Sequence, residues 1–183
     1  MEMTSVVLAG GRSTRLGRDK LVVEVGGRSL LQKVLEVLLP LSSEVLIVTA
    51  PGRAPLPMRD HAKVRWMEDV RPERGSLVGV YSGLRAATHP YSLVVAGDMP
   101  FLNEGLLRHM MAMASDCDVV MPRVGGHLEP LHAIYNKRCL PHFECLLAQG
   151  ELKIIDVLPR VNVKYLEEAE VDEFDPRHLC FFN

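Results

Sequence analysis

Short runs of hydrophobic residues alternate with longer amphipathic stretches along this chain. The runs SVVLA, EVLIV and SLVVA are almost continuously apolar, which is typical of strands buried on both faces of a parallel sheet. In the stretches between them, apolar residues recur at helical spacing, so that one side of each helix would pack against such a sheet. The pattern therefore predicts an α/β fold of three layers, a mostly parallel, Rossmann-like sheet with helices on both faces.

The predicted elements begin in βαβαβα order. We expect strands at residues 5–9, 44–49, 92–96, 118–121 and 133–136, and helices at 30–39, 77–87, 104–114 and 138–148. A further strand ends near residues 66–69, and another at 161–167 is followed by an acidic turn. Glycine and proline mark the loops between these elements, at residues 10–17, 26–27, 51–57, 71–75 and 125–126.

Size and charge limit the possible functions. A chain of 183 residues with 48 % hydrophobic residues is expected to form one domain over residues 1–183. It stops on apolar residues, which suggests that the protein continues beyond Asn183. A net charge of −2 favours neither nucleic acid nor a membrane surface as a partner. Any polyanionic ligand must therefore be bound by a local cluster of cations.

The four cysteines are irregularly spaced and include no C-x-x-C pair. We also see no signal peptide and no long apolar segment, so the sequence predicts reduced thiols and a cytoplasmic location. The histidines do not fall at ligand spacing around the cysteines either, which disfavours a zinc site.

A glycine-rich, basic loop follows the first predicted strand, from Gly10 to Lys20. Paired glycines let backbone N–H groups approach phosphate oxygens, and nearby arginines and lysine offer charge-assisted donors. The spacing fits neither a Walker A loop nor the dinucleotide fingerprint, which disfavours a dinucleotide-dependent oxidoreductase. The other interpretation is a solvated turn with basic residues facing water. The cluster of four cations favours a triphosphate site.

An acidic residue ends the strand at 92–96, in the segment from Gly97 to Pro100. Ligands of open α/β sheets collect beyond the carboxyl ends of the strands, where Asp98 would meet the glycine loop. Magnesium prefers one or two carboxylates together with phosphate oxygens and waters, so Asp98 is the candidate metal ligand. An aspartate capping a turn or a helix is the alternative, and the pairing with the first loop favours the metal.

The glycine loop resembles that of the molybdenum cofactor guanylyltransferases, in which it reads L-A-G-G-x-S-x-R-M-G-x-D-K. Each fixed position matches except for Leu16 in place of Met. The resemblance implies a nucleotidyltransferase fold and contacts to the nucleotide from Leu8, Ala9, Gly10, Gly11, Lys20, Asp69 and Asp98. It also implies catalytic roles for Arg15 and Lys20 at the phosphates and for Asp98 with Mg²⁺. Gly11 is informative, because related cytidylyltransferases look like L-A-A-G here.

Weaker matches extend the resemblance. Asp69 and the run at 75–79 match the family's acidic position and G-P-L-x-G run, with serine for proline. The segment with Glu129 and Pro130 resembles E-P-L-x-A-L-Y, which implies binding of the second substrate. A plain solvent-facing aspartate and a turn into an edge strand are the alternatives for these two segments. We expect His127 and His132 to be ordinary polar surface residues.

Two segments depart from the family. The family often has asparagine at the end of the strand that here closes on Thr49, Ala50 and Pro51, so one nucleotide contact is not carried over. The last three residues match only the start of F-x-N-I-N-T-P.

The resemblance implies transfer of GMP from GTP to molybdopterin or Mo-molybdopterin, with release of pyrophosphate. Other cofactor-biosynthesis proteins and molybdoenzymes would be partners. The alternatives are a related nucleotidyltransferase that uses CTP or another phosphorylated acceptor, and a GTP-binding regulatory module without turnover.

Overall fold

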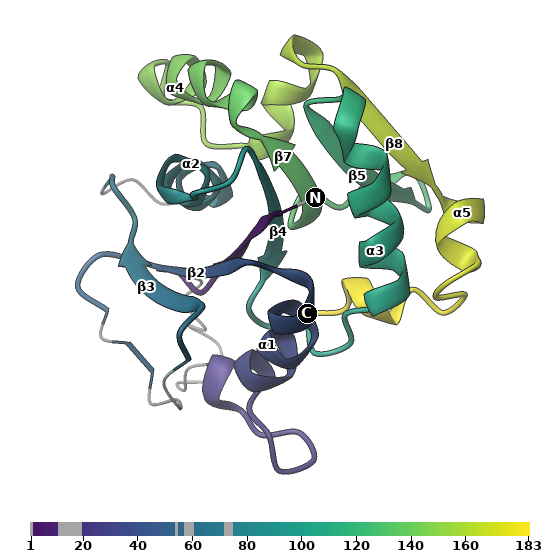
Figure 1. The fold of residues 1–183 in the computed structure, drawn as a ribbon. Helices are drawn as coiled ribbons and strands as arrows, with labels where there is room; N and C mark the ends of the chain where they lie inside the picture. Colours follow the sequence, from purple (N-terminus) through teal and green to yellow (C-terminus); the bar gives the residue numbers. More distant parts are fainter. Residues whose placement is uncertain (1, 11–19, 54, 57–60, 72–74) are drawn as a thin grey trace.

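The computed structural model describes residues 2–10, 20–53, 55–56, 61–71 and 75–183. Its centre is an eight-stranded sheet in the order β3-β2-β1-β4-β7-β5-β6, with β8 paired to β5 (Figure 1). The strands are β1 (Thr4–Leu8), β2 (Glu44–Thr49), β3 (Val64–Glu68), β4 (Tyr91–Ala96), β5 (Val119–Val124), β6 (His127–Leu128), β7 (His132–Asn136) and β8 (Val163–Glu167).

Helices cover both faces of the sheet, as Figure 1 shows. The α-helices are α1 (Leu30–Leu41), α2 (Ser76–Ala86), α3 (Glu104–Met113), α4 (Leu140–Ala148) and α5 (Glu168–Asp172). The 3₁₀ turns are η1 (Lys20–Val22), η2 (Ala114–Asp116), η3 (Lys137–Cys139), η4 (Ile154–Arg160) and η5 (Leu179–Phe181). Apolar residues of α1 and α3 form one core with the sheet, and those of α2 and α4 form a second core on its other face. The predicted three-layer α/β fold is therefore confirmed.

The sheet has a parallel half and a mixed half. Strands β3, β2, β1 and β4 run in the same direction, so their carboxyl ends meet at one edge, which we call the carboxyl edge. Strand β7 lies next to β4 but runs the opposite way. It therefore begins at the carboxyl edge, where His132 is in register with Val95. The amide of Ala96 donates to the Leu131 carbonyl across this junction, at 3.2 Å.

Helix α1 begins with a capping box. The Ser29 hydroxyl accepts from the Gln32 amide at 3.2 Å, and the Gln32 side chain accepts from the Ser29 amide at 2.9 Å. These bonds satisfy donors that the first turn of a helix leaves without partners. The prediction ended this helix at residue 39, before Pro40, but it runs to Leu41. Burial of Leu41 against the sheet accompanies this last turn.

Two other predicted segments differ from the structure in the type of element and not only in their ends. The predicted helix at 138–148 is divided into η3 and α4, because Pro141 has no N–H and is best placed in the first turn of an α-helix. The predicted acidic turn after residue 167 is helix α5 instead. The Glu167 amide donates to the Glu170 side chain at 3.1 Å, and Val171 is buried, so capping and packing together stabilise a short helix.

Two global properties bear on the sequence predictions. Within the described ranges, every helix is too short or too polar to cross a membrane. All four cysteines are free; Cys145 is exposed and the other three are buried.

Candidate functional site

The carboxyl ends of β1 and β4 lie directly beside each other. The Gly97 amide donates to the Leu8 carbonyl at 3.0 Å. A Cβ atom at position 97 would lie 2.9 Å from the Leu21 side chain, so the close fit favours glycine here. Asp98 follows in the turn after β4 and is partly buried. The structure therefore brings the start of the glycine loop and Asp98 to the same edge of the sheet.

Ala9 and Gly10 leave β1 along the end of β2. The Ala9 amide donates to the Val48 carbonyl at 2.8 Å, which continues the pairing of the two strands. Gly10 packs against the backbone of Ala50, since a Cβ atom there would lie 3.5 Å from the Ala50 nitrogen and 4.0 Å from Asp69 Oδ2. The first residues of the loop thus border both β2 and the residue that follows β3.

Asp69 lies at the same edge, immediately after β3. Its amide donates to the Thr49 carbonyl at 2.8 Å. One carboxylate oxygen, Oδ1, is buried and makes no hydrogen bond with any described residue. Burial raises the pKa of the Asp69 carboxyl, and the Ser82 hydroxyl opposes part of that rise. A buried acceptor without a partner is costly, so this oxygen is suited to a donor supplied by a ligand.

The structure describes little of the remaining loop. Gly11 and Arg15 lie outside the described residues, and Lys20 is described only as the first residue of η1, without its side chain. Their roles stay predictions.

The donor set at Asp98 fits a magnesium ion. Among the described residues, the structure shows no group of three or more histidine, cysteine, aspartate or glutamate side chains that could hold a metal. Magnesium needs only one or two carboxylates when phosphates and waters complete its octahedron. A single aspartate at the carboxyl edge satisfies that requirement if a ligand supplies the phosphates.

Glu129 and Pro130 lie between β6 and β7, next to the carboxyl end of β4. The Glu129 carbonyl accepts from the His132 amide at 3.0 Å, and the Pro130 carbonyl accepts from the Tyr135 hydroxyl at 2.8 Å. Burial raises the pKa of the Glu129 carboxyl, and His127 opposes this rise. These bonds hold a partly buried carboxylate beside the edge that carries Asp98.

His132 is buried, which corrects the prediction that it is a surface residue. It is 0 % exposed, because it belongs to β7 in the middle of the sheet, whereas His127 is exposed as predicted. The ring packs edge-on against Phe181, with centroids 4.9 Å apart, and neither ring nitrogen makes a hydrogen bond with a described residue. Burial lowers the pKa of His132 to about 4, against the opposing effects of the Asp175 charge and the approaching Cys180 backbone.

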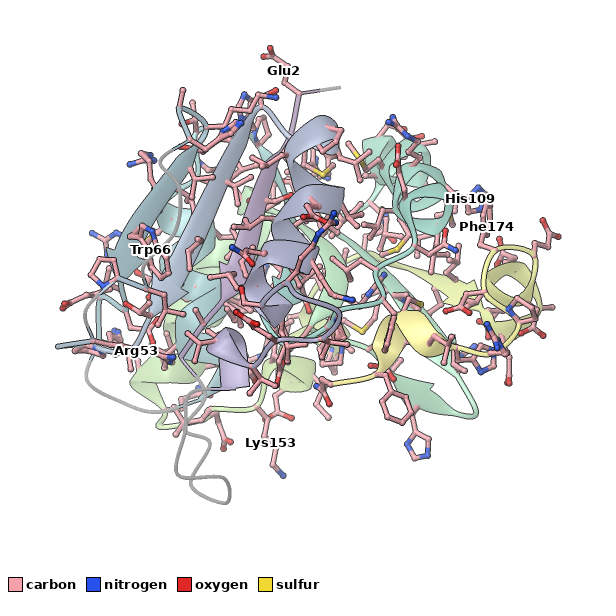
Figure 2. The ribbon with its side chains drawn as sticks, turned by 90° about the horizontal axis from the view of Figure 1, so that it is seen from below. Glu2, Arg53, Trp66, His109, Lys153 and Phe174 are labelled. Carbon is pink, nitrogen blue, oxygen red and sulfur yellow. The ribbon has the colours of Figure 1, made fainter. Side chains whose placement is uncertain are left out.

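Sequence reasoning missed two cations near this edge. Figure 2 shows Arg53 and Lys153 toward the end of the sheet opposite Glu2, which precedes β1. Lys153 is exposed and follows Leu152, which packs against Gly75 at the start of α2. Arg53 donates through Nη1 to the Ala9 carbonyl. The Pro-Gly pair before Arg53 is the signal in the sequence, but it predicts only a loop and not the partner of the arginine side chain.

A hollow of about 190 Å³ opens between η1 and α1. It is lined by Leu21, Val22, Glu24, Ser29, Leu31, Gln32, Leu35 and Leu56. Because Leu21 also packs on Gly97, the hollow borders the carboxyl edge. Its volume is below the roughly 300 Å³ of small ligand pockets, so by itself it would hold only part of a nucleotide.

The arrangement is that of a nucleotide-binding α/β fold, with a glycine loop after the first strand and an aspartate after the adjacent one. The family model described as the MobA-like NTP transferase domain matches residues 5–163. The chain belongs to this family of nucleotidyltransferases.

Similar proteins cover nearly the whole chain. A probable molybdenum cofactor guanylyltransferase of Pelotomaculum thermopropionicum is 36% identical over 183 residues, which are 100% of this chain and 87% of that protein. The molybdenum cofactor guanylyltransferase of Desulfosudis oleivorans is 32% identical, over 99% of this chain and 89% of that protein. The crystal structure of molybdopterin-guanine dinucleotide biosynthesis protein A from Archaeoglobus fulgidus superposes with a TM-score of 0.79 at 28% identity, covering 98% and 91% of the two chains.

Proposed function

We propose that this protein transfers GMP from GTP to the terminal phosphate of molybdopterin or Mo-molybdopterin, forming the guanine dinucleotide cofactor and pyrophosphate. The observation that carries the proposal is the convergence of Leu8–Gly10 (residues 8–10), Asp69 and Asp98 at one edge of the sheet. The printed names of the relatives support guanylyl transfer to this cofactor.

The reaction is a nucleotidyl transfer. A phosphate oxygen of the acceptor forms a bond to the α-phosphorus of GTP, and the bond from that phosphorus to the bridging oxygen of pyrophosphate breaks. Such transfers depend mainly on positioning and on neutralising charge. The acceptor phosphate is already ionised at neutral pH, so the site needs no strong base. Backbone donors, cations and one metal-binding carboxylate at the carboxyl edge are therefore sufficient for this reaction.

Each part of the edge has a proposed role. Residues 8–11 bind along the nucleotide, and the Asp69 carboxylate accepts a hydrogen bond from the base or the ribose. Asp98 would hold Mg²⁺, which supplies positive charge at the phosphates when bound. Arg15 and Lys20 are the proposed phosphate-binding cations, on the basis of sequence. Glu129 and Pro130, beside β4, are proposed to border the acceptor.

One departure keeps a second nucleotide in consideration. Thr49-Ala50-Pro51 replaces the strand-end asparagine expected for the family, so one contact to the base or ribose is different. Gly11 favours GTP, because the related cytidylyltransferases look like L-A-A-G at this point. CTP is therefore the competing donor to test.

The decisive experiment is a panel of GTP, CTP, ATP and UTP with molybdopterin as acceptor, following pyrophosphate with and without Mg²⁺. We expect GTP to give the highest kcat/KM and activity to require the metal. Equal use of the four nucleotides would remove the guanylyl assignment. Binding of GTP without pyrophosphate release would indicate a regulatory module instead.

A further inference from the structure

A tight turn carries the chain from β2 back over the carboxyl edge. It consists of residues 50–53, and the Arg53 amide donates to the Ala50 carbonyl at 3.2 Å. Pro51 occupies the second position, and Gly52 occupies the third with φ at +74°. This is the chemistry of a type II turn, in which proline presets one dihedral and glycine accepts a positive φ. The turn formed by A-P-G-R therefore sets the position from which the Arg53 side chain extends.

The Arg53 side chain reaches the start of the glycine loop. Its Nη1 donates to the Ala9 carbonyl, and the residue is partly buried at this position. Ala9 is itself fixed to β2 through its amide, and Gly10 packs directly against Ala50. The guanidinium thus ties the turn after β2 to the residues that precede the loop. A guanidinium has five N–H donors in a rigid plane, so the bond from Nη1 to the Ala9 carbonyl restricts the orientation of the group.

Thr49 is not equipped to replace the family's asparagine at this edge. Its hydroxyl donates to the Met67 carbonyl at 3.3 Å, so its proton is used inside the sheet. The residue is also 3 % exposed. Another residue would therefore supply any polar function that the family's asparagine has at the end of β2.

We propose that Arg53 supplies this function as a positioning residue for the nucleotide. It holds Ala9 and Gly10 in place through the Ala9 carbonyl, and it adds a positive charge beside a site for a polyanionic ligand. The inference rests on the proposed function, because it assumes that a nucleoside triphosphate binds at residues 8–11. Its effect is expected mainly on binding of the triphosphate and little on the chemical step.

The test compares Arg53→Ala and Arg53→Lys with the wild-type protein. We expect Arg53→Ala to raise the KM for GTP about tenfold with kcat changed less than about twofold, because one charge-assisted interaction is lost. Arg53→Lys should recover part of the loss, since it restores the charge without the planar fork. Added guanidinium ion should lower the KM of Arg53→Ala and leave the wild type unchanged.

Arg65→Ala is the matched control. Arg65 belongs to the neighbouring strand β3, but its guanidinium is bound to Glu44 at the other end of β2. We expect its KM for GTP to equal that of the wild type. Thermal unfolding of each variant, followed by circular dichroism, reports whether the fold is intact.

Two outcomes would overturn the inference. One is an Arg53→Ala protein with unchanged KM. The other is a rise in KM that neither lysine nor guanidinium reduces and that accompanies an equal loss of stability, which would make Arg53 purely structural. Calorimetry with GTP and guanosine separates this inference from the proposed function. Loss of GTP affinity in Arg53→Ala, with little change for guanosine, supports the role of Arg53 even if the protein transfers no nucleotide.

Discussion

Partly buried carboxylates occur at both edges of the sheet, but their surroundings are opposite. The edge at which the parallel strands begin is opposite the carboxyl edge, and we call it the amino edge. There, Glu44 accepts hydrogen bonds from the Thr4 hydroxyl, the Thr88 amide and the Arg65 guanidinium, at 2.8, 2.9 and 2.6 Å. Burial alone would raise the pKa of Glu44, yet these donors outweigh it and hold the pKa below its ordinary value.

Asp118, before β5, repeats this environment. It accepts from Arg138 at 2.6 Å and from the Asn162 amide at 2.9 Å, and its pKa is likewise lowered despite burial. At the carboxyl edge the balance is reversed. Burial raises the pKa of both Asp69 and Glu129, and Asp69 Oδ1 has no partner among the described residues.

Carboxylates that hold the fold together can therefore be distinguished from carboxylates that are available to a ligand. A carboxylate with several protein donors is already satisfied and stabilises the folded chain. One that is desolvated without such donors costs stability, and it gains its partners only when something binds. Substitutions at the two edges should therefore have opposite effects on activity and on stability.

The largest effect is expected for Asp98→Ala. Loss of the proposed metal anchor should lower the rate of pyrophosphate release at saturating GTP and Mg²⁺ by about a thousandfold. Asp116→Asn is the matched control, because Asp116 precedes β5 at the amino edge and is exposed. The control should retain wild-type turnover. Full turnover in Asp98→Ala would remove the metal assignment.

The next effect concerns His132, another residue at the carboxyl edge, whose two ring nitrogens make no hydrogen bond with a described residue. Its pKa of about 4 in the folded chain lies below the ordinary value of 6.5. The unfolded chain therefore binds more protons between these values, so stability falls as pH drops from about 6.5 to about 4, by roughly 3 kcal/mol. Urea unfolding across this range measures the slope.

His132→Phe supplies the comparison for that slope. Phenylalanine keeps an aromatic ring against Phe181 and removes the titrating group. The variant should lose most of the pH dependence between pH 6.5 and pH 4. An unchanged slope would show that other groups cause it.

Asp69→Asn tests the unsatisfied carboxylate. We expect the KM for GTP to rise about tenfold to a hundredfold, because the ligand loses a charged acceptor. Stability at pH 7 should stay the same or increase. The raised pKa of Asp69 means that the folded chain loses stability as pH rises from the ordinary pKa through the folded one, and asparagine removes this loss. A less stable variant with unchanged KM would contradict the assignment.

The smallest effect is expected for Glu44→Gln, which, in contrast to Asp69→Asn, should reduce stability and leave activity unchanged. It should lower the free energy of unfolding at pH 7 by about 1–2 kcal/mol, through weaker bonds to Thr4, Thr88 and Arg65, and leave kcat and KM unchanged. The pKa of Glu44 is lowered, so its contribution is present above the ordinary pKa and is lost as pH falls through the folded value. Denaturant unfolding at pH 7 and pH 3 should show the two proteins converging in acid.

The sequence predicted those parts of the fold that depend on local pattern. The apolar runs at the centre of the sheet and the helices that cover it are strongly periodic, and they appear as β1, β2, β4, α1, α2 and α3. The position of β7 between β4 and β5, and its reversed direction, depends on contacts between distant segments. Periodicity carries no information about such pairing. Helix α5 was missed because a five-residue helix relies on its cap and on one buried valine.

The candidate site likewise contains residues that local motifs predict and residues whose position depends on contacts between distant segments. Leu8, Gly10 and Asp98 stand next to strand ends in recognisable motifs, so sequence could point to their edge of the sheet. Arg53 could not be recognised, because its importance comes from a turn that directs it to the Ala9 carbonyl. His132 was misplaced because β7 is buried along its whole length between β4 and β5, and that position depends on contacts between distant segments. The roles of Gly11, Arg15 and Lys20 remain predictions, as do those of the other site residues.

The reversal of β7 divides the sheet into two halves that pair where β4 meets β7. Under the proposed function, the nucleotide donor and the phosphate acceptor would each be served by its own half of the sheet. Residues 125–131 form a short segment that contains the β5–β6 turn, β6 and the β6–β7 connection. Such short connecting segments tolerate insertions and exchanges far better than a βαβ crossover. We therefore expect acceptor preference to be exchangeable by grafting residues 125–131 from a relative, while the donor nucleotide stays the same.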